Sequence, residues 1–255
     1  MKASALRIGF FVPTFLLTAT ALADPRPFTF SNDTYPVGKG QWEYEQWVTY
    51  KARKEDESDF QRFEFRHEFE VGLADNFDLA VYLASWSYED SQDFSGTQFG
   101  SVDVEAVFYV TNPVTDFLGI GLYAETKIGE DSLAFENKLL VQKDVGKWVF
   151  LYNLVLETEL EGVFGDQENE VEGELANTFG VSYAIAPGLF LGAEGVVESA
   201  YEDWSHYEGT TVYFGPAFSY QRNDHFWFTI TPTYQLTDNE DEPDFQVRLI
   251  AGIMF

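Results

Sequence analysis

Hydrophobic and polar side chains alternate along almost all of the chain after about residue 40. The pattern is clearest in residues 60–73, where Phe63 and Phe65 share one parity and Glu64 lies between them. Successive side chains of a β-strand point to opposite faces, so such a run predicts a strand with one apolar and one ionic face. Helical spacing would instead scatter the phenylalanines around a cylinder, and the many aromatic and β-branched residues also favour strands.

The alternation recurs often enough to predict twelve strands, most of them about 10–14 residues long, whereas strands of soluble sheets usually have about five or six. A tilted strand that crosses a bilayer needs about 9–11 residues. Connections after even-numbered strands are short, and most of those after odd-numbered strands are longer and acidic. The predicted strands are residues 41–52, 60–73, 77–88, 99–110, 117–128, 133–143, 148–160, 170–183, 189–201, 210–220, 226–236 and 244–255.

The apolar parity carries no Asp or Glu in any predicted strand, whereas the opposite parity is rich in charges. A soluble container would turn its apolar face inward, but twelve long strands would make an unusually large one. In a bilayer every backbone polar group needs a partner and open sheet edges are excluded. An apolar outer band around a polar lumen is the pattern of a transmembrane barrel. We therefore predict an all-β fold, a closed antiparallel transmembrane β-barrel of about twelve strands with short periplasmic turns and longer acidic outer loops.

The first segment of the chain has the layout of an export signal. It has a short positive start, an apolar stretch and the small-residue ending Ala21-Leu22-Ala23. The alternative is a retained anchor helix, but the apolar stretch is too short to span a bilayer comfortably. We divide the chain into a signal peptide (1–23), a periplasmic N-terminal segment or possible plug (24–40) and the transmembrane β-barrel (41–255).

Composition removes several classes of function. Asp and Glu number 43 against 15 Lys and Arg, for a net charge of −28. This balance excludes nucleic acid as a partner, because binding requires bases that neutralise phosphates. A hydrophobic content of 45% argues against disorder. The absence of cysteine excludes disulfides, thiolate zinc sites and thiol nucleophiles. We expect no cofactor and no bound metal.

The last predicted strand ends in the run FQVRLIAGIMF, with alternating apolar residues before the terminal Phe255. This ending resembles the C-terminal assembly signal of Gram-negative outer-membrane proteins, which the barrel-assembly machinery reads. The chain is also similar, in residues 68–78, 186–196 and 215–236, to a loosely defined group of porin-like transporter barrels that includes relatives of the phenol-degradation pathway barrels. The resemblance implies an outer-membrane location in a Gram-negative bacterium, with outer-membrane lipids and the assembly machinery as partners. It indicates the barrel class well and the substrate hardly at all.

The densest group of candidate functional side chains is acidic. If residues 157–161 and 170–174 pair across a hairpin, their alternate glutamates share one lumen-facing patch near the outer mouth. Such a patch could attract monovalent cations, hold Ca²⁺ or capture a basic solute. The alternative is a solvated wall whose charges only keep the pore wet. The predicted selectivity residues are Glu157, Glu159, Glu161, Glu170, Glu172, Glu174 and, from the next strand, Glu198.

Two further groups of side chains occupy the strand positions that are predicted to face the lumen. The first is an array of opposed charges that could brace the wall with ion pairs or orient a passing solute. Its members are Lys51, Arg62, Glu64, Arg66, Glu68 and Glu70. The second is a set of aromatic residues that could form a track for solutes or simply narrow the bore. It comprises Trp47, Tyr82, Trp86, Tyr88, Tyr109, Tyr123, Tyr213 and Trp227.

Enzymatic function is not expected, because His67, His206 and His225 neither group with a serine nucleophile nor match a metal-binding spacing. The sequence favours an outer-membrane channel for passive passage of small solutes, with an acidic lumen that favours cations. The alternative is a largely plugged barrel with a ligand-binding or structural role through its acidic outer loops. Residues 24–40 precede the first strand and could supply the plug.

Overall fold

The computed structural model describes residues 26–164, 169–223 and 225–255, so the predicted signal peptide lies outside the described residues. Within these residues, fourteen strands form one antiparallel sheet. Within the described part of the chain, no helix is long and apolar enough to cross a membrane. The strands are β1 (Trp42–Lys54), β2 (Glu57–Ala74), β3 (Phe77–Tyr82), β4 (Trp86–Asp90), β5 (Ser95–Phe99), β6 (Ser101–Thr111), β7 (Gly119–Gly129), β8 (Ser132–Val145), β9 (Trp148–Glu161), β10 (Glu170–Ala186), β11 (Leu189–Glu202), β12 (His206–Asn223), β13 (Phe226–Gln235) and β14 (Phe245–Met254).

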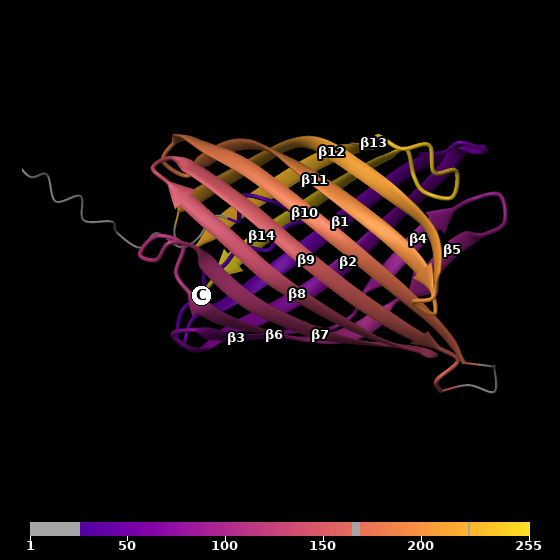
Figure 1. Cartoon of the computed structure of the whole chain (residues 1–255), viewed down its shortest axis with the longest axis horizontal. Coiled ribbons are helices and arrows are strands. Elements are labelled where there is room, and N and C mark those ends of the chain that lie inside the picture. The colour runs from indigo at the N-terminus through magenta and orange to yellow at the C-terminus, as the bar shows by residue number, and fades with distance from the viewer. Residues whose placement is uncertain (1–25, 165–168, 224) are drawn as a thin grey trace, which may run out of the picture.

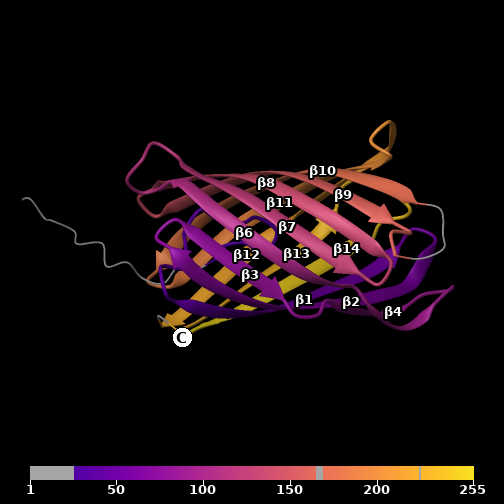
Figure 2. The same cartoon turned by 90° about the horizontal axis from the view of Figure 1, so that it is seen from below.

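Twelve of these strands close into a barrel, because β1 pairs with both β2 and β14. The strands are tilted strongly against the barrel axis (Figures 1 and 2). From β6 to β14 each strand pairs with the next one along the chain, as expected for an up-and-down barrel, and β6 pairs on its other side with β3. The predicted closed antiparallel barrel of about twelve strands is confirmed.

β4 and β5 lie outside the ring and replace the end of the predicted strand 77–88. β3 stops at Tyr82, and β4 begins at Trp86 after a short break. The long strand β2 pairs with both pieces, with β3 through residues 68–74 and with β4 through residues 61–65. The β4–β5 hairpin therefore extends the barrel wall at one end (Figure 1).

The two faces of the barrel wall differ as the alternation predicts. On β6, Val104 and Phe108 are 45% and 43% exposed, whereas Asp103 and Glu105 are 1% and 4% exposed. The exposed apolar side chains lie on the outside, and the buried acidic side chains lie inside. Soluble monomers rarely expose a continuous apolar surface of this extent, so the pattern is that of a wall turned toward lipid.

The seam of the barrel joins the first and last strands. The backbone N–H of Phe255 donates to the carbonyl of Trp42 at 2.9 Å, and that of Trp42 donates to the carbonyl of Phe255 at 3.2 Å. The barrel end at which Trp42 and Phe255 meet also carries the short turns, such as Asp75-Asn76 and Gly146-Lys147. We call it the periplasmic end and the opposite end the outer end.

Candidate functional site

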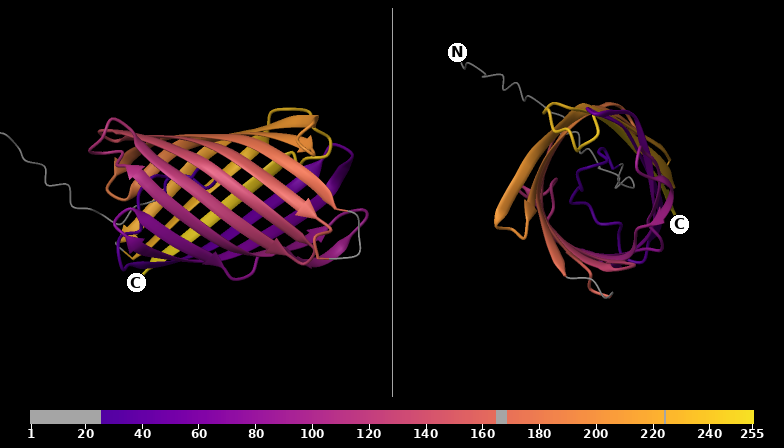
Figure 3. Two further views of the ribbon diagram at one scale, coloured as in Figure 1. Left: turned by 60° about the horizontal axis from the view of Figure 1, so that its bottom comes forward. Right: turned by 90° about the vertical axis from the view of Figure 1, so that its right-hand side faces the viewer.

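The N-terminal segment, here residues 26–40, runs inside the barrel near the periplasmic end (Figure 3). Glu194 of β11, which is fully buried, holds it by accepting three backbone N–H groups in succession. The donors are Thr29 at 3.0 Å, Phe30 at 2.8 Å and Ser31 at 2.7 Å. Hydrogen bonds to a charged acceptor are among the strong ones, so Glu194 is the main polar anchor of the segment.

Further wall residues bind the next part of the segment. The N–H of Thr34 donates to Gln142 Oε1 at 2.7 Å, and the N–H of Val37 donates to Asp78 Oδ2 at 2.8 Å. Gly40 then bonds backbone to backbone with Gly72 of β2 at 2.7 Å. The segment therefore contacts strands around much of the ring and narrows the interior.

Two wall glycines make room for this segment. A Cβ at Gly180 would lie 2.7 Å from the ring of Phe28, which is fully buried against Leu151. A Cβ at Gly119 would lie 2.3 Å from the Thr34 hydroxyl. Neighbouring atoms would have to shift to accommodate such contacts, so a side chain at Gly180 would press against the Phe28 ring and one at Gly119 against the Thr34 hydroxyl and Pro113.

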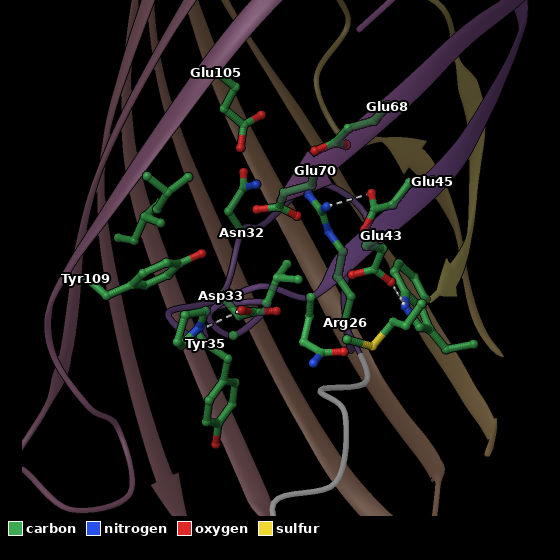
Figure 4. A pocket seen from close by; sticks show the side chains of 18 of the residues that line it. Arg26, Asn32, Asp33, Tyr35, Glu43, Glu45, Glu68, Glu70, Glu105 and Tyr109 are labelled. Atoms are coloured by element: carbon green, nitrogen blue, oxygen red, sulfur yellow. Dashed lines mark hydrogen bonds and ion pairs between the residues drawn. The ribbon is translucent and has the colours of Figure 1, made fainter. Parts of the chain in front are cut away.

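A cavity of about 880 Å³ lies between the segment and the wall at the periplasmic end (Figure 4). Arg26 is the one lysine or arginine among its described lining residues, and its Nη1 donates to Glu45 at 3.0 Å. The guanidinium also lies 4.5 Å from the centre of the Trp47 ring. The acidic lining residues are Asp33, Glu43, Glu45, Glu68, Glu70 and Glu105.

The carboxylates of this cavity differ in their partners. Trp227 Nε1 donates to Glu43, and the hydroxyls of Tyr82 and Tyr123 donate to Glu105 at 2.7 and 2.9 Å. Glu68 is 2% exposed, and its Oε2 has no hydrogen-bond partner among the described residues.

In the strand register, acidic residues of neighbouring strands form one line that leads from this cavity to the outer mouth. Glu43 is opposite Glu70, and the line continues across each neighbouring strand on the interior parity. Because the strands are tilted (Figure 1), a line perpendicular to them climbs from the periplasmic end toward the outer end. Only Ala80 interrupts it, between Glu70 and Glu105. This glutamate row comprises Glu43, Glu70, Glu105, Glu125, Glu136, Glu157 and Glu174.

Bases neutralise the middle of the glutamate row. Lys127 Nζ lies 2.7 Å from Glu157 and 3.2 Å from Glu136, and Lys138 Nζ lies 2.8 Å from Glu136. Arg66 pairs with Glu125 in the same row. Neither terminal part of the row has this compensation: Glu70 and Glu174 form no ion pair within the described residues. Unbalanced charge is therefore concentrated near the two mouths.

The predicted selectivity residues occupy the outer part of β9, β10 and β11. Glu157 is opposite Glu174, Glu159 opposite Glu172 and Glu161 opposite Glu170, the register proposed above. Glu198 is opposite Ala176 and thus diagonal to Glu174. Glu161, Glu170 and Glu172 are exposed at the rim. Sequence reasoning missed the ion pair of Glu157 with Lys127, because Lys127 comes from a different hairpin.

The predicted charge array is not one group in the structure. Because β2 runs the full height of the wall, its charges lie at different levels. Near the outer end, Glu64 pairs with Lys51 at 3.0 Å and with Arg62 at 3.2 Å. Arg66 lies at mid-height with Asp103 at 3.0 Å. Glu68 and Glu70 belong to the periplasmic cavity.

The predicted interior aromatic set is correct for six members and wrong for two. Trp86 is opposite Phe65 on β4, and their rings stack with centroids 4.0 Å apart. Tyr88 is opposite Phe63. Both therefore share the outward face of β2, because the break after Tyr82 reverses the parity. The interior members are Trp47, Tyr82, Tyr109, Tyr123, Tyr213 and Trp227.

No three histidine, aspartate or glutamate side chains converge on a metal-binding geometry in the part of the chain that the structure describes. The close carboxylates are spread along a wall rather than gathered around a point.

Comparison with known proteins identifies one matching family and several structures of similar fold. Residues 20–247 match the model of a family described as "Family of unknown function (DUF6662)". The structure is similar to that of the NanC porin, with a TM-score of 0.55, 11% identity, and 83% of this chain and 99% of that one covered. It is similar to the KdgM porin in complex with disordered oligogalacturonate, with a TM-score of 0.50, 12% identity and coverage of 84% and 98%.

The β domain of the Bordetella autotransporter BrkA is also similar, with a TM-score of 0.51, 12% identity and coverage of 85% and 100%. No curated protein matches the sequence. At these identities the likeness shows the fold, which is that of porin-like outer-membrane barrels of Gram-negative bacteria.

Proposed function

Because the chain belongs to the family of unknown function DUF6662, we propose its role from its geometry: an outer-membrane channel for passive passage of small solutes, with an interior that favours cations. Two of the similar folds, NanC and KdgM, are named porins. The role needs no chemical step, and none of the histidines is placed for one. We also propose that outer-membrane lipids surround the wall and that the barrel-assembly machinery reads the strand ending in Phe255.

The glutamate row is the observation that carries this proposal. It is a series of carboxylates, interrupted only at Ala80, that runs from the periplasmic cavity to the outer mouth and is accompanied by the bases Arg66 and Lys127. Carboxylate rings and rows are the devices that cation channels use for selection. The predicted selectivity residues Glu159, Glu172, Glu174 and Glu198 would act at the outer mouth, where cations enter.

The N-terminal segment favours a second candidate, a largely plugged barrel that binds a ligand or has a structural role. Its anchoring by Glu194 and the room made by Gly180 support a permanent position inside the wall. Twelve strands enclose a lumen intermediate between filled small barrels and wide porins, so a short segment can restrict it severely.

Conductance in planar lipid bilayers distinguishes the two roles. A channel gives discrete steps in KCl for the unaltered mature protein, and a variant that lacks residues 26–37 gives larger steps. A plugged barrel gives steps only after the deletion. If neither protein conducts above background although both are folded, the channel proposal is wrong.

A further inference from the structure

The periplasmic cavity is lined by more carboxyl groups than basic groups. Six carboxyl side chains line it, and the guanidinium of Arg26 is the only lysine or arginine group among its described lining residues. Arg26 forms an ion pair with Glu45 at 3.0 Å. Carboxylates this close together, away from bulk water, require either cations or protons to be stable. The wall therefore has the charge of a site for a cation.

Glu68 is the side chain that points to a missing partner. It is 98% buried, faces the cavity and lies directly opposite Glu45 across the β1–β2 ladder (Figure 4). Its Oε2 has no hydrogen-bond partner among the described residues. Buried polar atoms are almost always paired, so an unpaired carboxylate oxygen beside an open cavity indicates a ligand. Arg26 shows that the neighbouring position already accepts a cationic group.

The geometry favours an organic cation over a bare metal ion. A volume of about 880 Å³ is in the range of small-molecule sites and far exceeds one coordination sphere. Glu68 and Glu70 lie two residues apart on the same face of β2, about 7 Å along the strand. The two ammonium groups of a short aliphatic diamine are separated by a similar distance. Val107, Tyr109 and Leu140 also line the cavity and offer apolar surface for a methylene chain.

We propose that this cavity is a binding site for a short aliphatic diamine, with one ammonium group on Glu68 and the other on Glu70. The site goes beyond the proposed conduction and does not depend on it, because binding can be measured in a protein that conducts nothing.

Isothermal titration calorimetry of the full mature barrel in detergent tests the site with putrescine as the probe. We expect putrescine to bind with one site per barrel, and butylamine and MgCl₂ to bind at least about tenfold more weakly, since each lacks one feature of the match. The variant Glu68→Gln/Glu70→Gln should lose at least about tenfold in affinity for putrescine. The matched control Glu208→Gln/Glu240→Gln, which removes two exposed charges at the outer end, should bind as the unaltered protein does.

The variant Arg26→Ala should change the affinity for putrescine in the opposite direction, so this test does not rely on weakened binding. Removing the guanidinium frees Glu45 and lowers the positive charge of the cavity, so putrescine should bind more tightly. Circular dichroism and heat-modifiable migration establish that each variant is folded. The proposal is overturned if putrescine does not bind, if MgCl₂ or butylamine binds equally well, or if the Glu68→Gln/Glu70→Gln variant binds as the control does.

Discussion

Lys127 offsets part of the negative charge in the outer half of the glutamate row. Its ammonium group pairs with both Glu136 and Glu157, so one base offsets two acids of different strands. Its side chain is 22% exposed, so interior water partly screens these pairs and their worth to stability is modest. The same pairs still affect the electrostatic potential inside the barrel, because an ion that passed through the proposed channel would meet their local field.

Lys127→Met should therefore increase the preference for K⁺ over Cl⁻. One charge removed at lumen distances changes the permeability ratio by about twofold to fivefold at low salt. Reversal potentials in planar bilayers measure this ratio. Lys147→Met, which removes the same charge from an exposed periplasmic turn, is the control and should change little. A decrease after Lys127→Met, or an equal change in both variants, would contradict the assigned role.

The outer acids should act in the opposite direction. The variant Glu159→Gln/Glu172→Gln/Glu174→Gln removes three carboxylates that have no ion pair among the described residues, so it should lower the preference for K⁺. Adding Glu157→Gln should lower it further, because Lys127 then loses a partner.

The effect of these acids should be large at low salt and small near 1 M, where the screening length is only about 3 Å. The control Glu55→Gln/Glu208→Gln/Glu240→Gln removes three charges from exposed outer positions. The role of the outer acids is refuted if the control and the lumen variant have the same reversal potential.

At the scale of elements, the N-terminal segment depends above all on its main acceptor, Glu194, and on the space that Gly180 leaves in the wall. Glu194→Ala removes the acceptor of three backbone N–H groups, whereas Glu194→Gln keeps one neutral oxygen. We expect the backbone amide hydrogens of Phe30 and Ser31 to exchange fastest in the Glu194→Ala variant, more slowly in the Glu194→Gln variant and slowest in the unaltered protein. Loss of these charge-assisted hydrogen bonds should also weaken the binding of the segment to the wall by about 2–5 kcal/mol. Unchanged exchange in the Ala variant would show that Glu194 is not the anchor.

Gly180→Val tests the same element by steric exclusion. Its side chain would occupy the place of the Phe28 ring, so residues 26–31 should leave the wall and become accessible to added protease. Overpacking of this kind typically costs about 1–3 kcal/mol if the segment stays in place. Gly195→Val, where a Cβ meets nothing closer than 3.4 Å, is the control. Equal protection of residues 26–31 in both variants would be evidence against the packing described.

Most strands can be predicted from the sequence, because apolar and polar residues alternate with a period of two wherever one face of the strand is apolar. From β6 to β14 each strand pairs with the next one in the sequence, along the predicted runs. The exception is the strand predicted at 77–88. Its alternation continues through Leu83, but the backbone of Ser85 bonds to Ser101 and Gly100, and β4 turns over relative to β3. Only pairing across the sheet, which no single strand encodes, fixes that reversal.

Pro216 and Pro232 mark another local irregularity. The register on either side places them opposite each other on β12 and β13, where neither can donate a ladder hydrogen bond. Pairing resumes at Phe218 and Ile230. Proline positions thus indicate from the sequence where a ladder is interrupted, although not how its neighbours adjust.

At the scale of the whole molecule, the sequence predicts the barrel and its two faces but only part of the interior arrangement. Alternation assigns each glutamate to the inside, and the hairpin spacing pairs Glu157 with Glu174. It cannot reveal that Glu43 and Glu174, from strands far apart in the chain, belong to one tilted row. It also cannot show Arg26 inside the wall, because residues 26–37 have no periodicity and take their place through side chains such as Glu194.

The central claim is that the interior charges make the barrel a channel that favours cations. The most direct measurement is the reversal potential of the unaltered mature protein in a planar bilayer with a KCl gradient at low salt. We expect discrete conductance steps whose reversal potential is displaced toward the equilibrium potential of K⁺. A reversal potential at zero or displaced toward that of Cl⁻ would contradict it.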